Sequence, residues 1–301
     1  MKIGFSSLVC PEWDLDTILS QASTLGFDGV ELRGLRGDLN LPMVPDLARH
    51  PDRVRTMCAE QNVELVSLGC SATLTDGKRA AQAASKATIT EFVELAARLG
   101  CPYVRMFLGD ASRGDQPQRC LPRIVDGLRS LAPMLTRNGV TLLLENGGDF
   151  CGSADLWFVI DAVAHPNVQA AWNQCNALTL RERATNSIPR LGKKIRLVHV
   201  CDAVFNDDGV LQDYVSLGSG DAEVARQIEI LRGIMFTGYA MFEWPKLWVA
   251  TIPPAGDVLP AVATFLREQI EAQQSVLTAY KGDKKAPRLT PRSAPAGTAS
   301  A

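Results

Sequence analysis

Three side chains that could bind a metal ion or transfer protons stand at the ends of short apolar stretches. The stretch 140–144 stops at Glu145, the stretch 238–242 stops at Glu243, and the stretch 195–200 carries His199 near its end. A mainly apolar run such as 140–144 is typical of a strand buried on both faces, and the other two stretches are also typical of strands. Each polar group then stands where its strand leaves the core, which is where α/β barrel enzymes place their catalytic groups.

Other polar side chains occupy corresponding positions after further apolar stretches. They are Glu31, Arg33, Arg105, Asp110, Asn146, Asn173, Asn176, Asp202 and Lys246. Carboxylate, amide and imidazole groups around one point suit a hard or borderline divalent ion such as Mg²⁺, Mn²⁺ or Co²⁺. A histidine in a strand is also often a core residue, and a strand-end glutamate is often half of a salt bridge. Their joint appearance favours a site, because a carboxylate in an apolar barrel mouth is costly without a partner.

The elements that must position these groups follow a repeating pattern of strand and helix. The strands are predicted at 2–5, 28–32, 63–68, 102–107, 140–145, 168–172, 195–200 and 238–243. The helices are predicted at 14–25, 52–61, 80–99, 121–138, 153–164, 178–191, after an N-cap at Asp221, and at 257–275. Eight strictly alternating units predict an α/β fold, a single (β/α)₈ TIM barrel, over residues 1–278.

The sequence also bears on an alternative fold and on the C-terminal tail. A doubly wound open sheet is the alternative fold, but no Gly-x-Gly-x-x-Gly follows the first strand. Residues 279–301 are rich in Lys, Pro, Ala, Ser and Thr, and we expect them to form a disordered basic tail.

The composition is that of an ordinary soluble globular protein. Of the 301 residues, 46% are hydrophobic and 21% are charged, and the net charge of −2 gives no electrostatic argument for nucleic acid or a membrane surface. We find no signal peptide and no apolar run that could span a bilayer, and therefore expect a cytoplasmic protein. The eight cysteines include no Cys-x-x-Cys pair, which favours reduced thiols over a zinc site.

From residue 1 to about residue 273 the chain resembles the sugar phosphate isomerase/epimerase family, the xylose isomerase-like TIM barrels. The resemblance lies in five segments that stand in the family's order. They are Gly-Phe-Asp-Gly-Val-Glu-Leu at 26–32, Leu-Leu-Glu-Asn at 143–146, Val-His-Val-Cys-Asp-Ala at 198–203, Tyr-Val-Ser-Leu-Gly-Ser-Gly-Asp at 214–221, and Gly-Tyr-Ala-Met-Phe-Glu-Trp-Pro-Lys-Leu-Trp at 238–248.

The resemblance implies a divalent metal (Mn²⁺, Mg²⁺ or Co²⁺) held by Glu145, Asn173, His199 and Glu243. The family usually has Asp-x-x-His on the sixth strand, whereas this chain reads Asn173-Gln-Cys-Asn176. The loss of an anionic ligand should weaken metal binding, and the loss of the histidine removes a usual substrate contact. Cys201 also replaces the lysine that is common in the family.

The activity that the resemblance implies is isomerisation or epimerisation of a sugar through an enediolate. Glu145 and Glu243 would remove and return the proton, and the metal would act as a Lewis acid. Contacts to a small carbohydrate substrate are expected from Glu31, Arg33, Arg105, Asn146, Asn176, Asp202 and Lys246. The family also implies that the chain could form a homo-oligomer.

Two alternatives stay open beside this activity. One is a metal-dependent lyase or dehydratase acting on a keto-sugar, an inosose or a 3-keto-glycoside, because removal of an α-proton also begins an elimination. The other is a non-catalytic binding or partner subunit with a degenerate metal site, which the two asparagines favour. An apurinic endonuclease would need more ligands than the three histidines offer and a basic groove.

Overall fold

The structure is a computed structural model that describes residues 1–112 and 114–282, with side chains described as far as residue 272. Eight parallel strands close into a barrel in the order β1-β10-β7-β6-β5-β4-β3-β2. Their bounds are β1 (Lys2–Ser6), β2 (Gly29–Leu32), β3 (Glu64–Cys70), β4 (Tyr103–Gly109), β5 (Thr141–Gly148), β6 (Val168–Asn173), β7 (Ile195–Val200) and β10 (Tyr239–Phe242). The predicted TIM barrel is confirmed.

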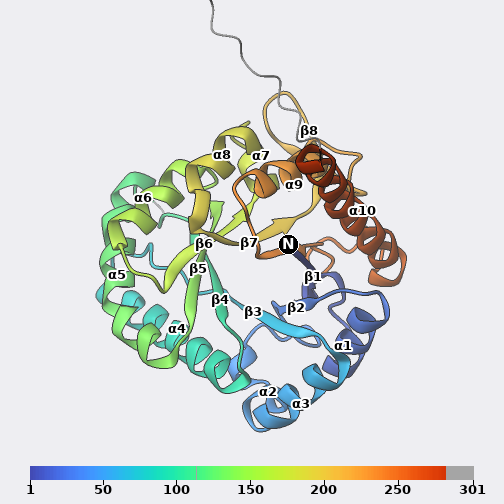
Figure 1. The fold of residues 1–301 in the computed structure, drawn as a ribbon. Coiled ribbons are helices and arrows are strands. Elements are labelled where there is room, and N and C mark those ends of the chain that lie inside the picture. Colours follow the sequence, from blue (N-terminus) through green and yellow to red (C-terminus); the bar gives the residue numbers. More distant parts are fainter. Residues whose placement is uncertain (113, 283–301) are drawn as a thin grey trace, which may run out of the picture.

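A ring of helices surrounds the strands (Figure 1). The α-helices are α1 (Leu15–Thr24), α2 (Pro45–Ala48), α3 (Pro51–Gln61), α4 (Arg79–Leu99), α5 (Pro117–Asn138), α6 (Ser153–Val163), α7 (Gln174–Leu178), α8 (Ala184–Leu191), α9 (Val224–Gly233) and α10 (Ala255–Gly282). Short 3₁₀ helices are η1 (Ser7–Val9), η2 (Leu41–Met43) and η3 (Gly192–Lys194). Local sequence sets several helix ends: the Asp14 carboxylate accepts from Thr17 N at the start of α1, and Gly100 takes a left-handed conformation after α4.

Two predicted elements differ from the structure near the end of the barrel. The segment 202–220, expected as a loop, contains the antiparallel hairpin of β8 (Asp202–Phe205) and β9 (Leu211–Val215). The predicted N-cap Asp221 is wrong, because α9 begins after Glu223 and the Asp221 carboxylate instead accepts from Phe205 N on the hairpin at 2.7 Å. A carboxylate that has a nearer backbone donor is not available to cap a helix.

The predicted helix at 178–191 is also wrong in extent. The structure has two helices here, α7 and α8, and Arg181 between them adopts a left-handed φ of 54°. The first of these helices starts directly at the end of β6, earlier than expected. This early start matters for the site, because the last residue of β6 becomes a helix cap.

Two apolar layers hold the barrel together. One lies between strands and helices and contains most of the buried side chains. The other fills the barrel interior and is formed by Val66, Leu143, Ala171, Leu197, Tyr239 and Met241, with Tyr103 packed against it. We call this second set the interior layer. Successive side chains of a strand alternate between its two faces, so the residues two positions later also face the barrel axis.

The last described element is helix α10, and the domain boundary predicted at residue 278 stays a prediction. Helix α10 continues through Gly282, and residues 283–301 of the predicted tail lie outside the described residues. Of the helices in the described part of the chain, none combines the length and the hydropathy needed to cross a membrane.

Candidate functional site

Six polar side chains meet inside the barrel directly above the interior layer. Alternation along the strands explains their position: Glu145 follows Leu143 by two residues, as Asn173, His199 and Glu243 follow Ala171, Leu197 and Met241 on their own strands. Glu31 of β2 and Arg105 of β4 complete the group. We call Glu31, Arg105, Glu145, Asn173, His199 and Glu243 the polar cluster.

His199 lies between two carboxylates of the polar cluster. Its Nδ1 is 2.9 Å from Glu145 Oε1, and its Nε2 is 3.3 Å from Glu31 Oε1. Burial disfavours a charged imidazole, but the carboxylates of Glu145, Glu243 and Glu31 outweigh it and raise the pKa of His199. The strand-end histidine therefore lies among charged groups, and not in an apolar core.

Arg105 is the fixed cation of the polar cluster. Its Nε lies 3.0 Å from Glu145 Oε2, and its Nη2 lies 3.3 Å from Glu31 Oε1 and 3.7 Å from Glu243 Oε1. Its side chain is 0% exposed. A planar guanidinium can face several carboxylates at once, so Arg105 offsets their mutual repulsion. In this arrangement Arg105 orients the glutamates, whereas the sequence predicted that it would bind the substrate.

Asn173 presents a hydrogen-bond donor to the glutamates. Its Nδ2 donates to Glu145 Oε1 at 3.2 Å and to Glu243 Oε2 at 2.9 Å. Its Oδ1 faces the other way and accepts from the backbone N of Cys175 and Asn176, as the N-cap of α7. The helix start thus fixes the amide orientation. In this arrangement the amide oxygen predicted as a metal ligand points away from the carboxylates.

The environments of Glu145 and Glu243 push their pKa values in opposite directions. Burial alone would raise the pKa of Glu145, but the charges of His199 and Arg105 outweigh it and lower that pKa. Burial and the nearby Glu145 raise the pKa of Glu243. Glu243 is also the more accessible of the two, with a side chain 13% exposed against 0% for Glu145. Two carboxylates in contrasting environments are suited to acid and base roles.

The polar cluster contains buried atoms that could take a further partner. Among the described residues, Glu31 Oε2, Glu145 Oε2 and His199 Nε2 are buried and make no hydrogen bond. One ligand atom from each of Glu31, His199 and Glu243 lies within 4.8 Å of the other two. Carboxylate oxygens beside an imidazole nitrogen fit a divalent cation. Glu31, which the sequence placed among the substrate contacts, belongs to this group of possible ligand atoms, whereas Asn173 does not.

The two other predicted amides join the loops around the polar cluster. Asn146 Nδ2 donates to the backbone O of Cys151 and of Asn173, and its Oδ1 accepts from Asn173 N. Asn176 Nδ2 donates to Asn146 O at 2.8 Å. These bonds tie β5, β6 and α7 together, so the Asn146 amide and the Asn176 Nδ2 are already bonded to backbone groups.

Asp202 and Lys246 also hold backbone, at the rim of the barrel. The Asp202 carboxylate accepts from four backbone N–H groups, which belong to Ala203, Gly218, Gly220 and Ala222. Lys246 Nζ donates to the carbonyls of Ala250 and Ile252, both at 2.6 Å. Each anchors a loop in this structure, and the contact with substrate that the sequence predicted for each stays a prediction.

Arg33 lies at the mouth of the barrel. Its Nη2 donates to Ser71 Oγ at 2.7 Å, and its guanidinium carbon is 5.6 Å from the ring centre of Trp248. Trp248 is 54% exposed. Arg33 itself is only 6% exposed and lies beside this exposed ring, and its contact with substrate stays a prediction.

One residue of the site escaped the sequence reading. Ser6 ends β1, is fully buried, and lies with its Oγ 3.1 Å from Glu31 Oε1 as a donor. The available signal was its place at the end of the first strand, directly after the apolar residues that begin the barrel. A serine is too common at strand ends to be distinguished by that place alone.

A comparison with protein families agrees with this fold. The family model described as xylose isomerase-like TIM barrel matches residues 19–269. No curated protein sequence matches the chain at a significant level.

The solved structures that resemble this chain share its fold at low sequence identity. An L-ribulose 3-epimerase has a TM-score of 0.75 and 17% identity, over 95% of this chain and 99% of that chain. A probable 3-DHS dehydratase from Bacillus anthracis has a TM-score of 0.73 and 16% identity, over 89% and 99%. An IOLI protein with a bound zinc atom has a TM-score of 0.73 and 16% identity, over 93% and 99%.

Proposed function

The chain belongs to the xylose isomerase-like TIM barrel family, and on that premise we propose that it is an isomerase or epimerase of a sugar or sugar derivative, acting through an enediolate of the substrate. One observation supports the proposal: Glu145, near the end of β5, and Glu243, directly after β10, both accept from the same Asn173 amide. Two carboxylates that lie this close together can both reach one carbon atom of a substrate. The L-ribulose 3-epimerase that shares the fold supports the choice of reaction.

Glu145 would remove the proton next to the substrate carbonyl. It is fully buried, and in the metal-free protein the charges of His199 and Arg105 lower its pKa. When a neutral His199 holds the metal, the Arg105 guanidinium would still keep Glu145 ionised. Glu243, whose pKa is raised, would return a proton, and its partial exposure lets the proton be replaced from solvent. Return to the opposite face of the same carbon gives an epimer, whereas return to the neighbouring carbon gives an isomer.

Mn²⁺, Mg²⁺ or Co²⁺ held by Glu31, Glu145, His199 and Glu243 would supply Lewis-acid stabilisation of the substrate oxygen on which negative charge develops. Glu145, His199 and Glu243 are retained from the predicted ligand set. Asn173 would donate its amide hydrogens and thereby orient the glutamates, as its contacts to both of them indicate. Arg33 would orient substrate hydroxyl groups at the mouth.

A lyase or dehydratase acting on a keto-sugar is the second candidate. The same base would begin an elimination, and a neighbour with the same fold is a probable dehydratase. We propose a cytoplasmic location for either activity, which the eight free cysteines support. A non-catalytic binding protein is the third candidate, and the donor orientation of Asn173 supports it.

The deciding experiment combines metal analysis with deuterium exchange. We would measure bound Mn²⁺, Co²⁺ and Mg²⁺ by mass spectrometry, and then incubate the protein with ketoses in deuterated water and follow the substrate protons by NMR. We expect solvent deuterium to enter next to the carbonyl, with loss of exchange in Glu145→Gln and Glu243→Gln.

The products separate the candidates. An isomer or epimer conserves mass, whereas elimination releases water or an aglycone. Exchange that continues unchanged in both glutamine variants would refute the assigned roles of Glu145 and Glu243. Absence of exchange and of bound metal across the ketoses and keto-sugars tested would favour the binding protein.

A further inference from the structure

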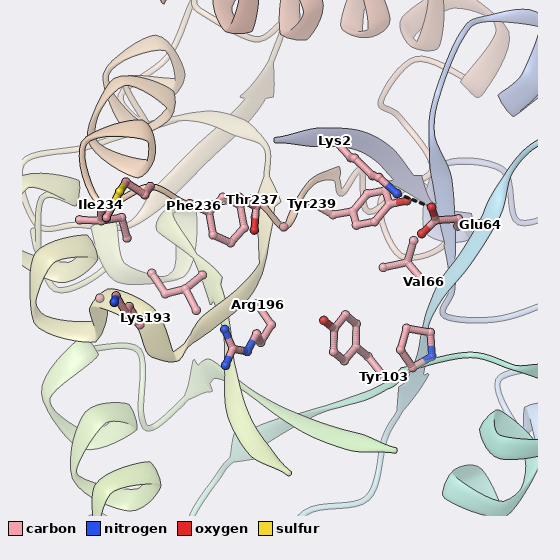
Figure 2. Close-up of a pocket in the computed structure, with 15 residues that line it drawn as sticks. Lys2, Glu64, Val66, Tyr103, Lys193, Arg196, Ile234, Phe236, Thr237 and Tyr239 are labelled. Carbon is pink, nitrogen blue, oxygen red and sulfur yellow. Dashed lines mark hydrogen bonds and ion pairs between the residues drawn. The ribbon is translucent and has the colours of Figure 1, made fainter. Parts of the chain in front are cut away.

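A cavity of about 640 Å³ lies at the end of the barrel opposite the polar cluster. Its walls include the first residues of strands, among them Lys2 of β1, Glu64 of β3, Tyr103 of β4 and Tyr239 of β10 (Figure 2). The interior layer separates this cavity from the polar cluster, since Val66 and Tyr239 of that layer form part of the cavity wall. The volume is within the range of about 300–1,000 Å³ that is typical of small-molecule sites.

Three aromatic rings give the cavity flat apolar walls. Tyr103, Phe236 and Tyr239 line it, and all three are labelled in Figure 2. A close approach of the backbone holds Phe236 in place: a Cβ on Gly238 would lie 2.2 Å from Arg196 O and 2.6 Å from the Phe236 ring. Only glycine therefore permits this packing, and the wall is built into the fold before any ligand arrives.

The charges in the cavity do not balance. Lys2 and Glu64 form an ion pair, and Lys2 Nζ also lies 5.5 Å from the ring centre of Tyr239. Lys193 and Arg196 line the same cavity, and within the described part of the chain neither has an ion-pair partner. Figure 2 shows them on the side of the cavity away from the Lys2–Glu64 pair. The cavity thus combines aromatic walls with two available cations.

We propose that this cavity is a binding site for a small organic anion with a flat, ring-shaped body. Arg196 and Lys193 hold the carboxylate, phosphate or sulfonate group, because a guanidinium forms paired hydrogen bonds with such groups. The ring of the ligand packs against Tyr103 and Phe236. This site is separate from the polar cluster, and the inference does not depend on the reaction proposed there.

The test is a fluorescence titration of the full chain with 8-anilinonaphthalene-1-sulfonate, a flat aromatic sulfonate. The neutral control probe is N-phenyl-1-naphthylamine, which has the same rings without the sulfonate. We expect saturable binding of one sulfonate probe per chain, and affinity for the neutral probe that is weaker by about tenfold. Equal binding of the two probes would overturn the role of the cations.

Three variants locate the probe. Arg196→Gln should weaken binding of the sulfonate by about tenfold, whereas Arg119→Gln, a matched exposed arginine on α5, should not. Thr237→Trp places a large ring in the cavity and should abolish binding. Circular dichroism checks that each variant is folded, and the exposed Arg196 keeps the test valid if Thr237→Trp fails to fold.

Three results with the unmodified chain and the cavity variants would each overturn the proposal. They are the absence of saturable binding, undiminished binding in folded Arg196→Gln, and undiminished binding in folded Thr237→Trp. Glu243→Gln serves as a control for the other end of the barrel. Loss of probe binding in that variant would place the probe at the polar cluster and would also overturn the proposal.

Discussion

The two ends of the barrel use charge in opposite ways. At the carboxyl ends of the strands, the charged groups of the polar cluster are buried and face one another, so each determines where its neighbours lie. At the amino ends, Lys193 and Arg196 are exposed beside aromatic walls, and neither has an ion-pair partner in the described part of the chain. The charged groups at the carboxyl ends are therefore expected to matter for stability, whereas the two cations at the amino ends are free to bind a ligand.

We expect the largest loss of stability when Arg105, the buried cation of the polar cluster, is removed. Arg105→Met leaves Glu31, Glu145 and Glu243 without the guanidinium that offsets their repulsion. We expect the free energy of unfolding to fall by about 3–5 kcal/mol, since breaking a buried ion pair leaves uncompensated buried charge. Urea unfolding followed by circular dichroism measures the change.

The control for this prediction is Arg226→Met, which removes an exposed arginine that pairs with Glu229 on α9. Exposed pairs contribute little, so we expect no measurable change. A double variant, Arg105→Met with Glu31→Gln, should recover part of the loss because it also removes one of the carboxylates. Equal unfolding midpoints for Arg105→Met and Arg226→Met would show that the cluster charges are not coupled as described.

The sequence predicted the barrel because its strands are apolar runs and its polar groups stand at their ends. The level of a side chain along the barrel axis was harder to predict. Strand four was expected to end at residue 107, whereas β4 runs through Gly109. Arg105 is therefore level with Leu143 in the register, below Glu145. A residue expected at the rim became a buried ion-pair partner.

The orientation of Asn173 could not be predicted for a related reason. The helix after β6 was expected to begin near residue 178, but α7 begins at Gln174. The N–H groups of this early helix take the Asn173 oxygen and leave the nitrogen facing the glutamates. Whether an amide acts as ligand or donor depends on such neighbours, which a single strand-end residue does not reveal.

Asn173→Asp tests whether that donor controls the affinity for a cation. The change replaces a hydrogen-bond donor by an anion beside Glu145 and Glu243, so a divalent ion should be favoured. We expect Mn²⁺ affinity to rise by about tenfold or more, measured by isothermal titration calorimetry. Without metal, the added carboxylate should lower the unfolding temperature.

The matched control is Asn176→Asp, because Asn176 contacts the backbone of Asn146 and no carboxylate of the polar cluster. It should leave Mn²⁺ affinity unchanged. A similar gain in both variants would mean that added negative charge attracts the ion non-specifically. No gain in Asn173→Asp would show that Asn173 does not limit metal binding.

Lys246→Met tests whether the loop that Lys246 anchors at the rim of the barrel opens independently of the polar cluster. It removes the two hydrogen bonds to the carbonyls of Ala250 and Ile252. We expect about 1 kcal/mol of local destabilisation and faster amide hydrogen exchange in residues 247–252, with exchange of the barrel strands unchanged. Faster exchange throughout β7 and β10 would instead show that the rim and the polar cluster open together.

The smallest effect is expected where charge is not needed for folding. Arg196→Gln removes an exposed cation that has no ion-pair partner among the described residues, so the unfolding temperature should not change measurably. The same variant should lose binding of the sulfonate probe, and in the unmodified chain that binding should weaken as salt rises. Loss of probe binding without loss of stability would mean that Arg196 serves an anion site and does not support the fold. Marked destabilisation by Arg196→Gln would show instead that the amino ends of the strands also rely on charge, and the contrast between the two ends would fail.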